Sequence, residues 1–252
     1  MSGMYEDLAE IYERAGFTRF SRQMAPRVAE LIRQRKPGTR RVCDLACGTG
    51  DAAVHLAREG FEMVGLDASA RMLAQARAKG AAAGVQVQWL HADARDFVLP
   101  RPVDVVTCMY DALNYLLREE DLAAAFRCVR AGLQPGGLFI FDMNTRSGLA
   151  ETWGTDERVE TPDDDLCVIW QSSYDHETEV NTVVLTAFVR EGPGLFRRIR
   201  EVHRERGHAV ERVRALLGEA GLRVVALGDL DMHPLQPDSA RFLAVAERPR
   251  EG

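Results

Sequence analysis

The nine residues Val42-Cys43-Asp44-Leu45-Ala46-Cys47-Gly48-Thr49-Gly50 contain the transition that decides the fold. A short apolar strand is predicted over 41–45, and a helix over 51–58 follows the glycine-rich loop. Gly48 and Gly50 permit backbone conformations and a close ligand approach that a Cβ atom would prevent. The free N–H groups at the start of the helix favour electron-rich ligand groups. The segment therefore predicts a nucleotide-binding loop at the carboxyl end of a strand.

Strand and helix signals alternate on both sides of this loop. Helices are expected from Ser21 to Pro37, over 51–58, after the N-cap Ser69, over 119–131 and over 210–220. Strands are expected over 41–45, 62–66, 85–89, 103–109, 138–143, 222–227 and 242–246, with a turn at 135–137. Such alternation with short connections predicts a doubly wound α/β fold, in which helices cover both faces of a mostly parallel sheet.

The pattern changes after residue 145. A polar stretch over 146–165 precedes three consecutive predicted strands, which lie over 166–174, 180–190 and 195–206. Consecutive strands joined by turns predict an antiparallel meander. We therefore expect three parts: an N-terminal helical segment at 1–38, a sheet domain made of 39–148 and 207–252, and an inserted antiparallel β lid at 149–206.

Acidic residues end the next two predicted strands as well. Asp67 follows Gly50 by seventeen residues, where a carboxylate can accept hydrogen bonds from both ribose hydroxyls. Asp93 can accept a hydrogen bond from an adenine amino group, and the Ala94 N–H can donate to the ring. Met72 is placed to lie against the adenine face. Simpler interpretations exist, since Asp67 could be a helix cap and Met72 plain core, but the three markers together predict adenosine binding.

The type of adenosine ligand is decided by the residues around the loop. The spacing Gly48-x-Gly50-x-x-Ala53 also fits the dinucleotide fingerprint. Asp44 opposes that interpretation, because a carboxylate suits a ligand with an amino group and is unfavourable beside a pyrophosphate. The sequence also lacks the P-loop pattern G-x-x-x-x-G-K-[ST].

Four motifs resemble those of the class I S-adenosylmethionine-dependent methyltransferases. They are D-L-A-C-G-T-G at 44–50, V-G-L-D-A-S-x-x-M-L at 64–73, the Asp93-Ala94 step, and L-x-P-G-G-L-F-I-F-D at 133–142. A narrower similarity, to bacterial small-molecule methyltransferases with an antiparallel β lid, includes amino-sugar N,N-dimethyltransferases. It is carried by Ile11-Tyr12, D-A-L-N-Y-L at 111–116 and I-W-Q at 169–171. The chain departs from these patterns at Ala46, where glycine is commonest, and at Glu13, where the narrower group often has Asp.

The resemblance implies S-adenosyl-L-methionine as the cofactor, a Rossmann-like methyltransferase sheet with an inserted antiparallel β meander, and a set of binding residues. Asp44, Ala46 and Gly48 would hold the methionine part. Asp67 would hold the ribose, with Ala68 beside it. The remaining members are Met72, Asp93 and Ala94 for the adenine, Met109 near the sulfur, and Tyr12 and Phe20 from an N-terminal segment that closes over the site.

The acceptor is expected beyond the ends of the fourth and fifth strands. A sulfonium methyl group is already activated, so the protein mainly positions the reactants and excludes water. A general base is needed only if the acceptor must lose a proton, and the sequence leaves the catalytic residues unknown. The candidate acceptor residues are Tyr110, Asp111, Asn114, Asp142, Asn144, Trp170, Arg198 and Arg200. Turn and cap roles are the alternative for Asn114 and Asn144.

Arginines are concentrated at the end of the insertion, with seven between Arg197 and Arg214. Along the strand over 195–206, alternation places Arg198, Arg200, Arg204 and Arg206 on one face and Ile199, Glu201, His203 and Glu205 on the other. The arginine row predicts either recognition of a phosphate or carboxylate group or a solvated face paired with the acidic loop 163–165. Trp170 and Tyr174 share a face, as cover for the acceptor or as core of the lid.

Composition sets the remaining limits. The chain has 252 residues, of which 46% are hydrophobic, and a net charge of −6, which disfavours nucleic acid as a partner. No apolar run suggests a membrane span and no signal peptide is recognisable, so we expect a cytoplasmic protein. The cysteines and histidines lack metal-ligand spacing, so no metal is expected, and a homodimer is compatible with these features. The sequence therefore predicts methyl transfer to a small molecule. The alternatives are an RNA-modifying enzyme that uses the arginine face and a cofactor-binding module without turnover.

Overall fold

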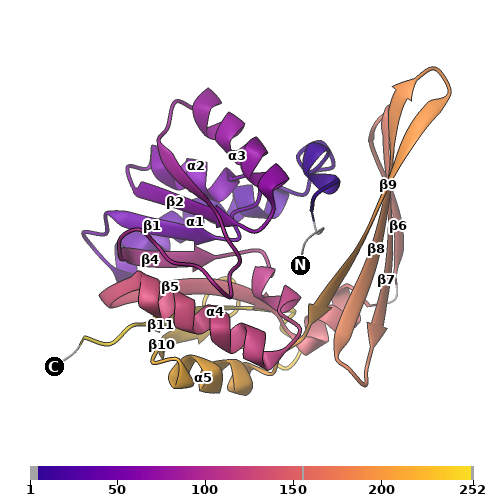
Figure 1. The fold of residues 1–252 in the computed structure, drawn as a ribbon. Coiled ribbons are helices and arrows are strands. Elements are labelled where there is room, and N and C mark those ends of the chain that lie inside the picture. The colour runs from indigo at the N-terminus through magenta and orange to yellow at the C-terminus, as the bar shows by residue number, and fades with distance from the viewer. Residues whose placement is uncertain (1–4, 155, 251–252) are drawn as a thin grey trace.

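The computed structural model describes residues 5–154 and 156–250, and the chain forms two sheets (Figure 1). The central sheet has seven strands in the order β10-β11-β5-β4-β1-β2-β3. The first five in sequence run parallel, while β11 runs antiparallel to both β5 and β10. Their bounds are Arg41–Leu45 (β1), Glu62–Asp67 (β2), Val87–His91 (β3), Val103–Cys108 (β4), Leu133–Asn144 (β5), Arg223–Gly228 (β10) and Arg241–Glu247 (β11). The predicted doubly wound, mostly parallel fold is confirmed.

Helices cover both faces of this sheet. They are α1 (Arg19–Arg35), α2 (Asp51–Arg58), α3 (Ala70–Ala82), α4 (Glu119–Gly132) and α5 (Val210–Glu219). Along β4, Val105 packs in the cluster of α1 and α2, whereas Val106 packs in the cluster of α4 and α5. All six residues of β4 are buried, as expected for a strand covered on both faces. Among the described helices, none is long and apolar enough to cross a membrane.

Two local expectations outside the residues 149–206 were wrong. Helix α1 begins at Arg19, so Ser21 lies in its first turn and is not its N-cap. The predicted turn at 135–137 lies inside β5, where the pairing with β4 shifts register and Gly136 has φ +74°. A glycine accommodates this irregularity because it has no Cβ atom to clash.

The second sheet, which we call the meander sheet, is antiparallel with the order β6-β7-β8-β9. Its strands are β6 (Glu157–Asp163), β7 (Leu166–Asp175), β8 (Val180–Gly192) and β9 (Leu195–Arg206), and the sheet stands beside the helix-covered body (Figure 1). The sequence predicted three of these strands and missed β6. That edge strand is exposed along its whole length, so it carries no alternation of buried and exposed residues.

The N-terminal segment, residues 5–17, packs against the inner face of the meander sheet. Leu8, Ile11 and Phe17 share one apolar cluster with residues of β7, β8 and β9. In addition, the carboxylate of Glu201 in β9 accepts hydrogen bonds from the backbone N–H groups of Tyr5, Asp7 and Leu8 at 2.7–3.0 Å. The segment also contacts the central domain, where Glu13 forms an ion pair with Lys79 of α3 at 2.6 Å. It therefore connects the two sheets.

Candidate functional site

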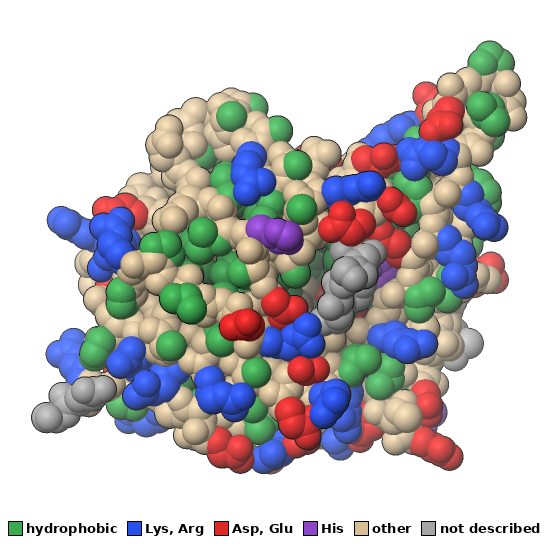
Figure 2. Space-filling model, in the orientation of Figure 1, with side chains coloured by type: hydrophobic (Ala, Val, Ile, Leu, Met, Phe, Trp, Pro, Cys, Tyr) green, Lys and Arg blue, Asp and Glu red, His purple; other side chains and the backbone are tan. Residues whose placement is uncertain are grey.

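A cavity lies at the carboxyl ends of β1, β2, β3 and β4, and we call it the sheet-edge cavity. This edge is where open α/β sheets bind their ligands. Tyr5 and Tyr12 of the N-terminal segment line its other side. The space-filling view shows the hollow between the main body and the meander sheet (Figure 2).

The loop after β1 presents bare backbone to this cavity. Gly48 has φ +53°, and a Cβ atom built on it would have no protein atom within 4 Å. Gly50 has φ +80°, and a Cβ atom there would lie 2.7 Å from the Trp89 ring. Gly48 therefore leaves room for a ligand, whereas Gly50 is required by the left-handed turn and by the packing of Trp89.

Asp67 is held in a fixed orientation at the end of β2. Its Oδ2 atom accepts a hydrogen bond from the Gly48 N–H at 2.8 Å, and its Oδ1 atom accepts one from the Ser69 N–H at 2.8 Å. Burial raises the pKa of Asp67, while these hydrogen bonds act to lower it. The N-cap of α3 is Ser69, whose hydroxyl accepts from the Met72 N–H. The carboxylate of Asp67 thus lines the cavity and does not itself cap the helix.

Nine of the eleven residues predicted to bind the cofactor line the sheet-edge cavity. They are Tyr12, Ala46, Gly48, Asp67, Ala68, Met72, Asp93, Ala94 and Met109. Asp93 is also paired with Arg95 at 2.7 Å, and this contact lowers the pKa of Asp93. Eight of these residues lie at or just after the ends of β1, β2, β3 and β4, which the parallel sheet brings together, and Tyr12 comes from the N-terminal segment.

The structure does not bring the other two to the cavity surface. Asp44 is buried behind the loop and accepts a hydrogen bond from the Thr107 hydroxyl at 2.8 Å. Burial raises the pKa of Asp44 to about 7. Phe20 stacks on Tyr110 with ring centroids 5.0 Å apart, so it supports a lining residue from behind.

A second cavity lies between the N-terminal segment, the end of β4 and the meander sheet, and we call it the inter-sheet cavity. The two cavities share four tyrosines, Tyr5, Tyr12, Tyr110 and Tyr115. The hydroxyls of Tyr5 and Tyr115 are hydrogen-bonded at 2.5 Å. Burial raises the pKa of all four phenols, so they are neutral at physiological pH. An aromatic boundary therefore joins the two cavities.

The backbone at this boundary is strained. Tyr110 and Asp111 have φ values of +66° and +53°, although neither is a glycine. Asp142 accepts a hydrogen bond from the Tyr110 N–H at 2.6 Å, and Arg241 pairs with both Asp142 and Asp111. The Arg241 guanidinium also lies 4.7 Å from the Phe20 ring centroid. Strained backbone persists only where its surroundings determine it, and these contacts do so here.

Asn114 and Asn144 form the frame behind this turn and line neither cavity. The Asn114 amide donates to the carbonyl oxygens of Asn144 and Arg206, which ties the end of β5 to the end of β9. The Asn144 amide donates to the carboxylates of Asp111 at 3.0 Å and Glu205 at 2.8 Å. Both asparagines thus position other side chains, which corrects the expectation that they contact the acceptor directly.

The arginine row on β9 lies away from both cavities. Arg198 and Arg200 are exposed, whereas Ile199, Glu201 and His203 on the opposite face are buried. The prediction that this row pairs with the acidic loop 163–165 is wrong. The acidic loop instead pairs with Arg14, through Asp163, and with Arg190, through Asp165.

Trp170 lines the inter-sheet cavity, as do Tyr110 and Asp111. Tyr174 packs on His176 at the far end of β7 and lines neither cavity. Sequence reasoning missed six lining residues with polar groups, namely Tyr5, Tyr115, Trp153, Asn181, His203 and Glu205. The alternation along β9, which set Glu205 opposite the arginines, was the signal that could have found it.

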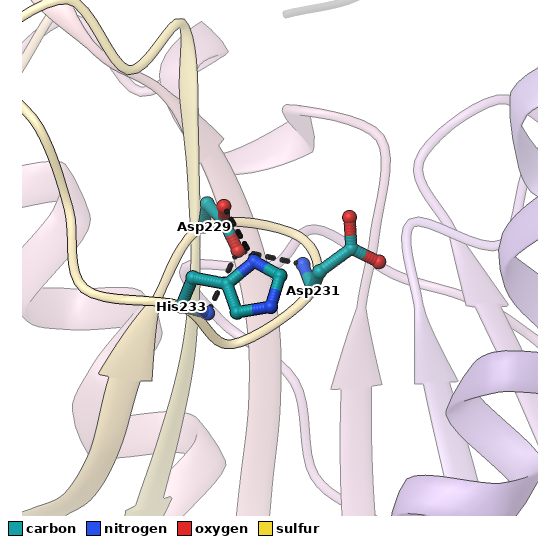
Figure 3. Close-up of side chains that lie close together, drawn as sticks. All are labelled: Asp229, Asp231 and His233. Carbon is teal, nitrogen blue, oxygen red and sulfur yellow. Dashed lines mark hydrogen bonds and ion pairs between the residues drawn. The ribbon is translucent and has the colours of Figure 1, made fainter.

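A small polar cluster lies elsewhere, in the loop between β10 and β11 (Figure 3). Asp229, Asp231 and His233 bring potential metal-ligand atoms within 4.8 Å of one another, a grouping that the sequence did not predict. Asp229 accepts hydrogen bonds from the backbone N–H groups of Asp231 and His233 at 2.8 and 2.9 Å, and Asp231 pairs with Arg27. These contacts account for the cluster as a hydrogen-bonded turn.

Comparison with known proteins gives a consistent family. The family described as "Methyltransferase domain" matches residues 42–137. The chain is 31% identical over 217 residues to a protein of Geobacillus sp. named "Putative methyltransferase", covering 84% of this chain and 86% of that protein. It is 33% identical over 138 residues to the dTDP-3-amino-3,6-dideoxy-alpha-D-glucopyranose N,N-dimethyltransferase of Streptomyces fradiae, covering 54% of this chain and 52% of that enzyme.

Solved structures share the architecture. An S-adenosylmethionine-dependent methyltransferase from Clostridium acetobutylicum superposes with a TM-score of 0.85 at 24% identity, covering 97% of this chain and 99% of that one. DesVI of Streptomyces venezuelae superposes with a TM-score of 0.72 at 25% identity, covering 90% and 91% of the two chains. The likeness extends over both sheets of the present chain.

Proposed function

The chain belongs to the S-adenosylmethionine-dependent methyltransferases, and we propose that it methylates a small molecule held in the inter-sheet cavity. The observation that carries this proposal is the pair of adjoining cavities with a shared aromatic boundary. One cavity has the features of a nucleoside site, and the other adjoins it across the shared tyrosines. Methyl transfer requires two ligands in this relation, because the acceptor must attack the methyl carbon in line with the departing sulfur.

In this proposal the cofactor occupies the sheet-edge cavity. The bare backbone at Gly48 faces the methionine part, the carboxylate of Asp67 accepts hydrogen bonds from the ribose hydroxyls, and Met72 packs on the adenine. Asp93 and Ala94 lie where they would face the adenine edge. When bound, the cofactor supplies a methyl group on a positively charged sulfur. Met109 and Tyr110, which follow β4, would then lie near that sulfur.

We propose the meander sheet as the lid of the acceptor site, with residues 149–206 as its bounds. The proposed N-terminal part is 1–38, of which residues 1–4 lie outside the described residues, and the cofactor domain comprises 39–148 and 207–252. Trp170 contributes apolar cover, and Phe17 packs edge-on against it with centroids 5.0 Å apart. Such enclosure excludes water from the sulfonium and keeps the reactants in position.

Several of the named relatives support a nitrogen acceptor, whereas a Thermus thermophilus relative is a demethylmenaquinone methyltransferase and a Klebsiella pneumoniae relative is a ubiquinone biosynthesis O-methyltransferase. Two Streptomyces relatives are N,N-dimethyltransferases of dTDP-linked amino sugars, and a Halorhodospira halochloris relative is a glycine/sarcosine N-methyltransferase. An RNA acceptor has less support, because the arginine row that suggested it lies on the outer face of β9. Among the described residues that line the inter-sheet cavity, none is lysine or arginine. We therefore propose an amine of a small molecule as the acceptor.

The test is a methylation screen. The protein is incubated with S-adenosylmethionine labelled in its methyl group and with a bacterial metabolite extract, and the label and the homocysteine product are followed by mass spectrometry. A parallel arm contains only the RNA of the same cells. We expect a labelled small molecule and no labelled RNA. Labelled RNA would support the RNA-modifying alternative, and cofactor binding without turnover in any arm would support the binding module.

A further inference from the structure

The inter-sheet cavity carries an excess of negative charge. Asp111 and Glu205 line it, and the described lining residues include no lysine or arginine that would oppose them. Among the described lining residues, His203 is the one that carries a titratable basic group. A cavity of this kind repels phosphate and carboxylate groups and attracts a cation.

The surrounding contacts leave Glu205 as the carboxylate without a counter-charge. Asp111, Asp142 and Glu205 converge on the end of β5, and Arg241 is the guanidinium that bonds to the first two. Glu205 receives only the neutral amide of Asn144, at its Oε2 atom. Within the described part of the chain, its Oε1 atom has no hydrogen-bond partner.

Other titratable groups from each neighbouring element act on Glu205. They are Tyr110, Asp111 and Tyr115 from the segment after β4, Asp142 from β5 and Arg241 from β11. His203 on β9 itself and Tyr5 from the N-terminal segment line the same cavity. Burial raises the pKa of Glu205, the charge of Asp111 raises it further, and the Asn144 hydrogen bond and Arg241 lower it. The ionised carboxylate is thus poorly stabilised by the protein alone, and a cationic ligand group would stabilise it.

We propose that Glu205 is the specificity-determining residue of the inter-sheet cavity. Its carboxylate binds the acceptor as an ammonium ion and then takes a proton from it. This inference rests on the proposed function and names the group in the lid cavity that selects an amine. Asp111, which already pairs with Arg241, supports this role through its negative charge.

The reaction balances with the groups named. The carboxylate Oε1 accepts one proton from the acceptor ammonium, which leaves a neutral amine and a neutral carboxylic acid in a site of low polarity. The nitrogen lone pair forms the bond to the methyl carbon, and the electron pair of the broken carbon–sulfur bond stays on sulfur. The products are the N-methylated ammonium and neutral S-adenosylhomocysteine, and Glu205 returns its proton to solvent when they leave. No oxidant or further reactant is required.

This arrangement discriminates against hydroxyl acceptors. An ammonium ion has a pKa near the range in which a buried carboxylate can accept its proton, whereas an alcohol is far too weak an acid. An alcohol would also leave the carboxylate without a counter-charge in the cavity, which is costly. The same residue therefore provides both binding and selection.

The test uses the amine product found in the methylation screen and compares two variants, Glu205→Gln and Glu179→Gln. Glu179 is a matched control, because it lies in the turn between β7 and β8 of the same sheet, pairs with Arg146 at 2.9 Å and lines neither cavity. Near neutral pH we expect Glu205→Gln to lower kcat/KM for the acceptor by about 100-fold or more, with an unchanged Kd for S-adenosylhomocysteine. Glu179→Gln should retain the wild-type kcat/KM.

The pH profile separates proton transfer from a structural role. In Glu205→Gln the neutral amine must come from solution, so its kcat/KM should rise about tenfold per pH unit up to the pKa of the acceptor amine. The wild-type profile should be much flatter over that range. A deficit of constant size at every pH, a variant as active as Glu179→Gln, or a methyl group found on oxygen or carbon would each overturn the inference. If the wild type methylates nothing, the proposed function itself fails.

Discussion

Asp67 shows how single residues prepare this site before any ligand binds. Its two carboxylate oxygens are each fixed by one backbone N–H, from the loop after β1 and from the start of α3. The carboxylate is therefore already oriented toward the cavity, and little rotational freedom is lost when a ligand binds.

Replacing Asp67 by Asn should weaken cofactor binding by about ten- to a hundredfold. A hydrogen bond to a charged group contributes about 1.5–3 kcal/mol, and the amide keeps the size of the side chain while it loses the charge. Calorimetric titration with S-adenosylhomocysteine measures the effect, and thermal unfolding of the free variant checks the fold. A wild-type Kd in a folded variant would show that Asp67 only supports the loop.

We predict that Asp44 makes the affinity for the cofactor depend on pH. Burial raises its pKa to about 7, so in the free protein it is partly protonated at neutral pH. In our account the ammonium group of the methionine part lies nearby and favours the ionised form. Binding then releases a proton, so affinity should increase as the pH rises from about 6 to about 8.

Two controls isolate this effect. Asp44→Asn should make the Kd of S-adenosylhomocysteine nearly independent of pH over the same range. Methylthioadenosine, which lacks the amino acid part, should bind the wild type without this dependence. Equal pH profiles for the two ligands would assign the proton release to another group.

The N-terminal segment is the element whose position depends most on one side chain. Glu201 of β9 accepts three backbone hydrogen bonds from residues 5–8 and forms a contact with His203 at 3.3 Å. Burial acts to raise its pKa, but the hydrogen bonds dominate and the net shift is downward. The carboxylate is therefore ionised at neutral pH, and its stabilising contribution is lost only as the pH falls through its lowered pKa.

Glu201→Gln should release this segment without unfolding the sheets. We expect faster amide hydrogen exchange over residues 5–17 and a higher Kd for S-adenosylhomocysteine, because Tyr5 and Tyr12 close the sheet-edge cavity. Glu191→Gln is the control on the same sheet, since Glu191 is exposed and contacts only Arg197 among the described residues. Unchanged exchange in Glu201→Gln would refute the role given to this contact.

For the outer face of β9 we predict that substitutions have no effect on activity. Arg198 and Arg200 are exposed and point away from both cavities, so the double variant Arg198→Ala, Arg200→Ala should keep its stability within about 0.5 kcal/mol. Its kcat/KM for the acceptor should equal that of the wild type. A fall of tenfold or more would mean that this face does bind the acceptor, as one of the sequence hypotheses held.

Sequence patterns predicted elements best where burial is repetitive. The fully buried β4 and the glycine loop after β1 were identified with nearly correct bounds, because their signals are local. The exposed β6 was missed, since an edge strand without a buried face has no period. Asp44 and Phe20 were expected at the ligand surface and lie behind it. Local sequence does not reveal how deeply a side chain is buried. For the same reason it did not identify Tyr5 and Glu205 as lining residues.

At the scale of the whole molecule, the two sheets and the segment between them form one functional unit. The central sheet supplies the nucleoside pocket, the meander sheet supplies the cover, and the tyrosines of the boundary belong to both cavities. The chain has a net charge of −6, and in the inter-sheet cavity Glu205 is a carboxylate without a counter-charge beside the paired Asp111. This distribution favours two cationic ligands, a sulfonium cofactor and an ammonium acceptor.

A crystal structure of the chain with S-adenosylhomocysteine tests the central claim most directly. Our account predicts that the ligand fills the sheet-edge cavity with its ribose hydroxyls within hydrogen-bond distance of Asp67. Its sulfur should face the tyrosine boundary, so that a methyl group on it would point into the inter-sheet cavity toward Glu205. A ligand whose sulfur faces away from that cavity, or which binds elsewhere, would contradict the account.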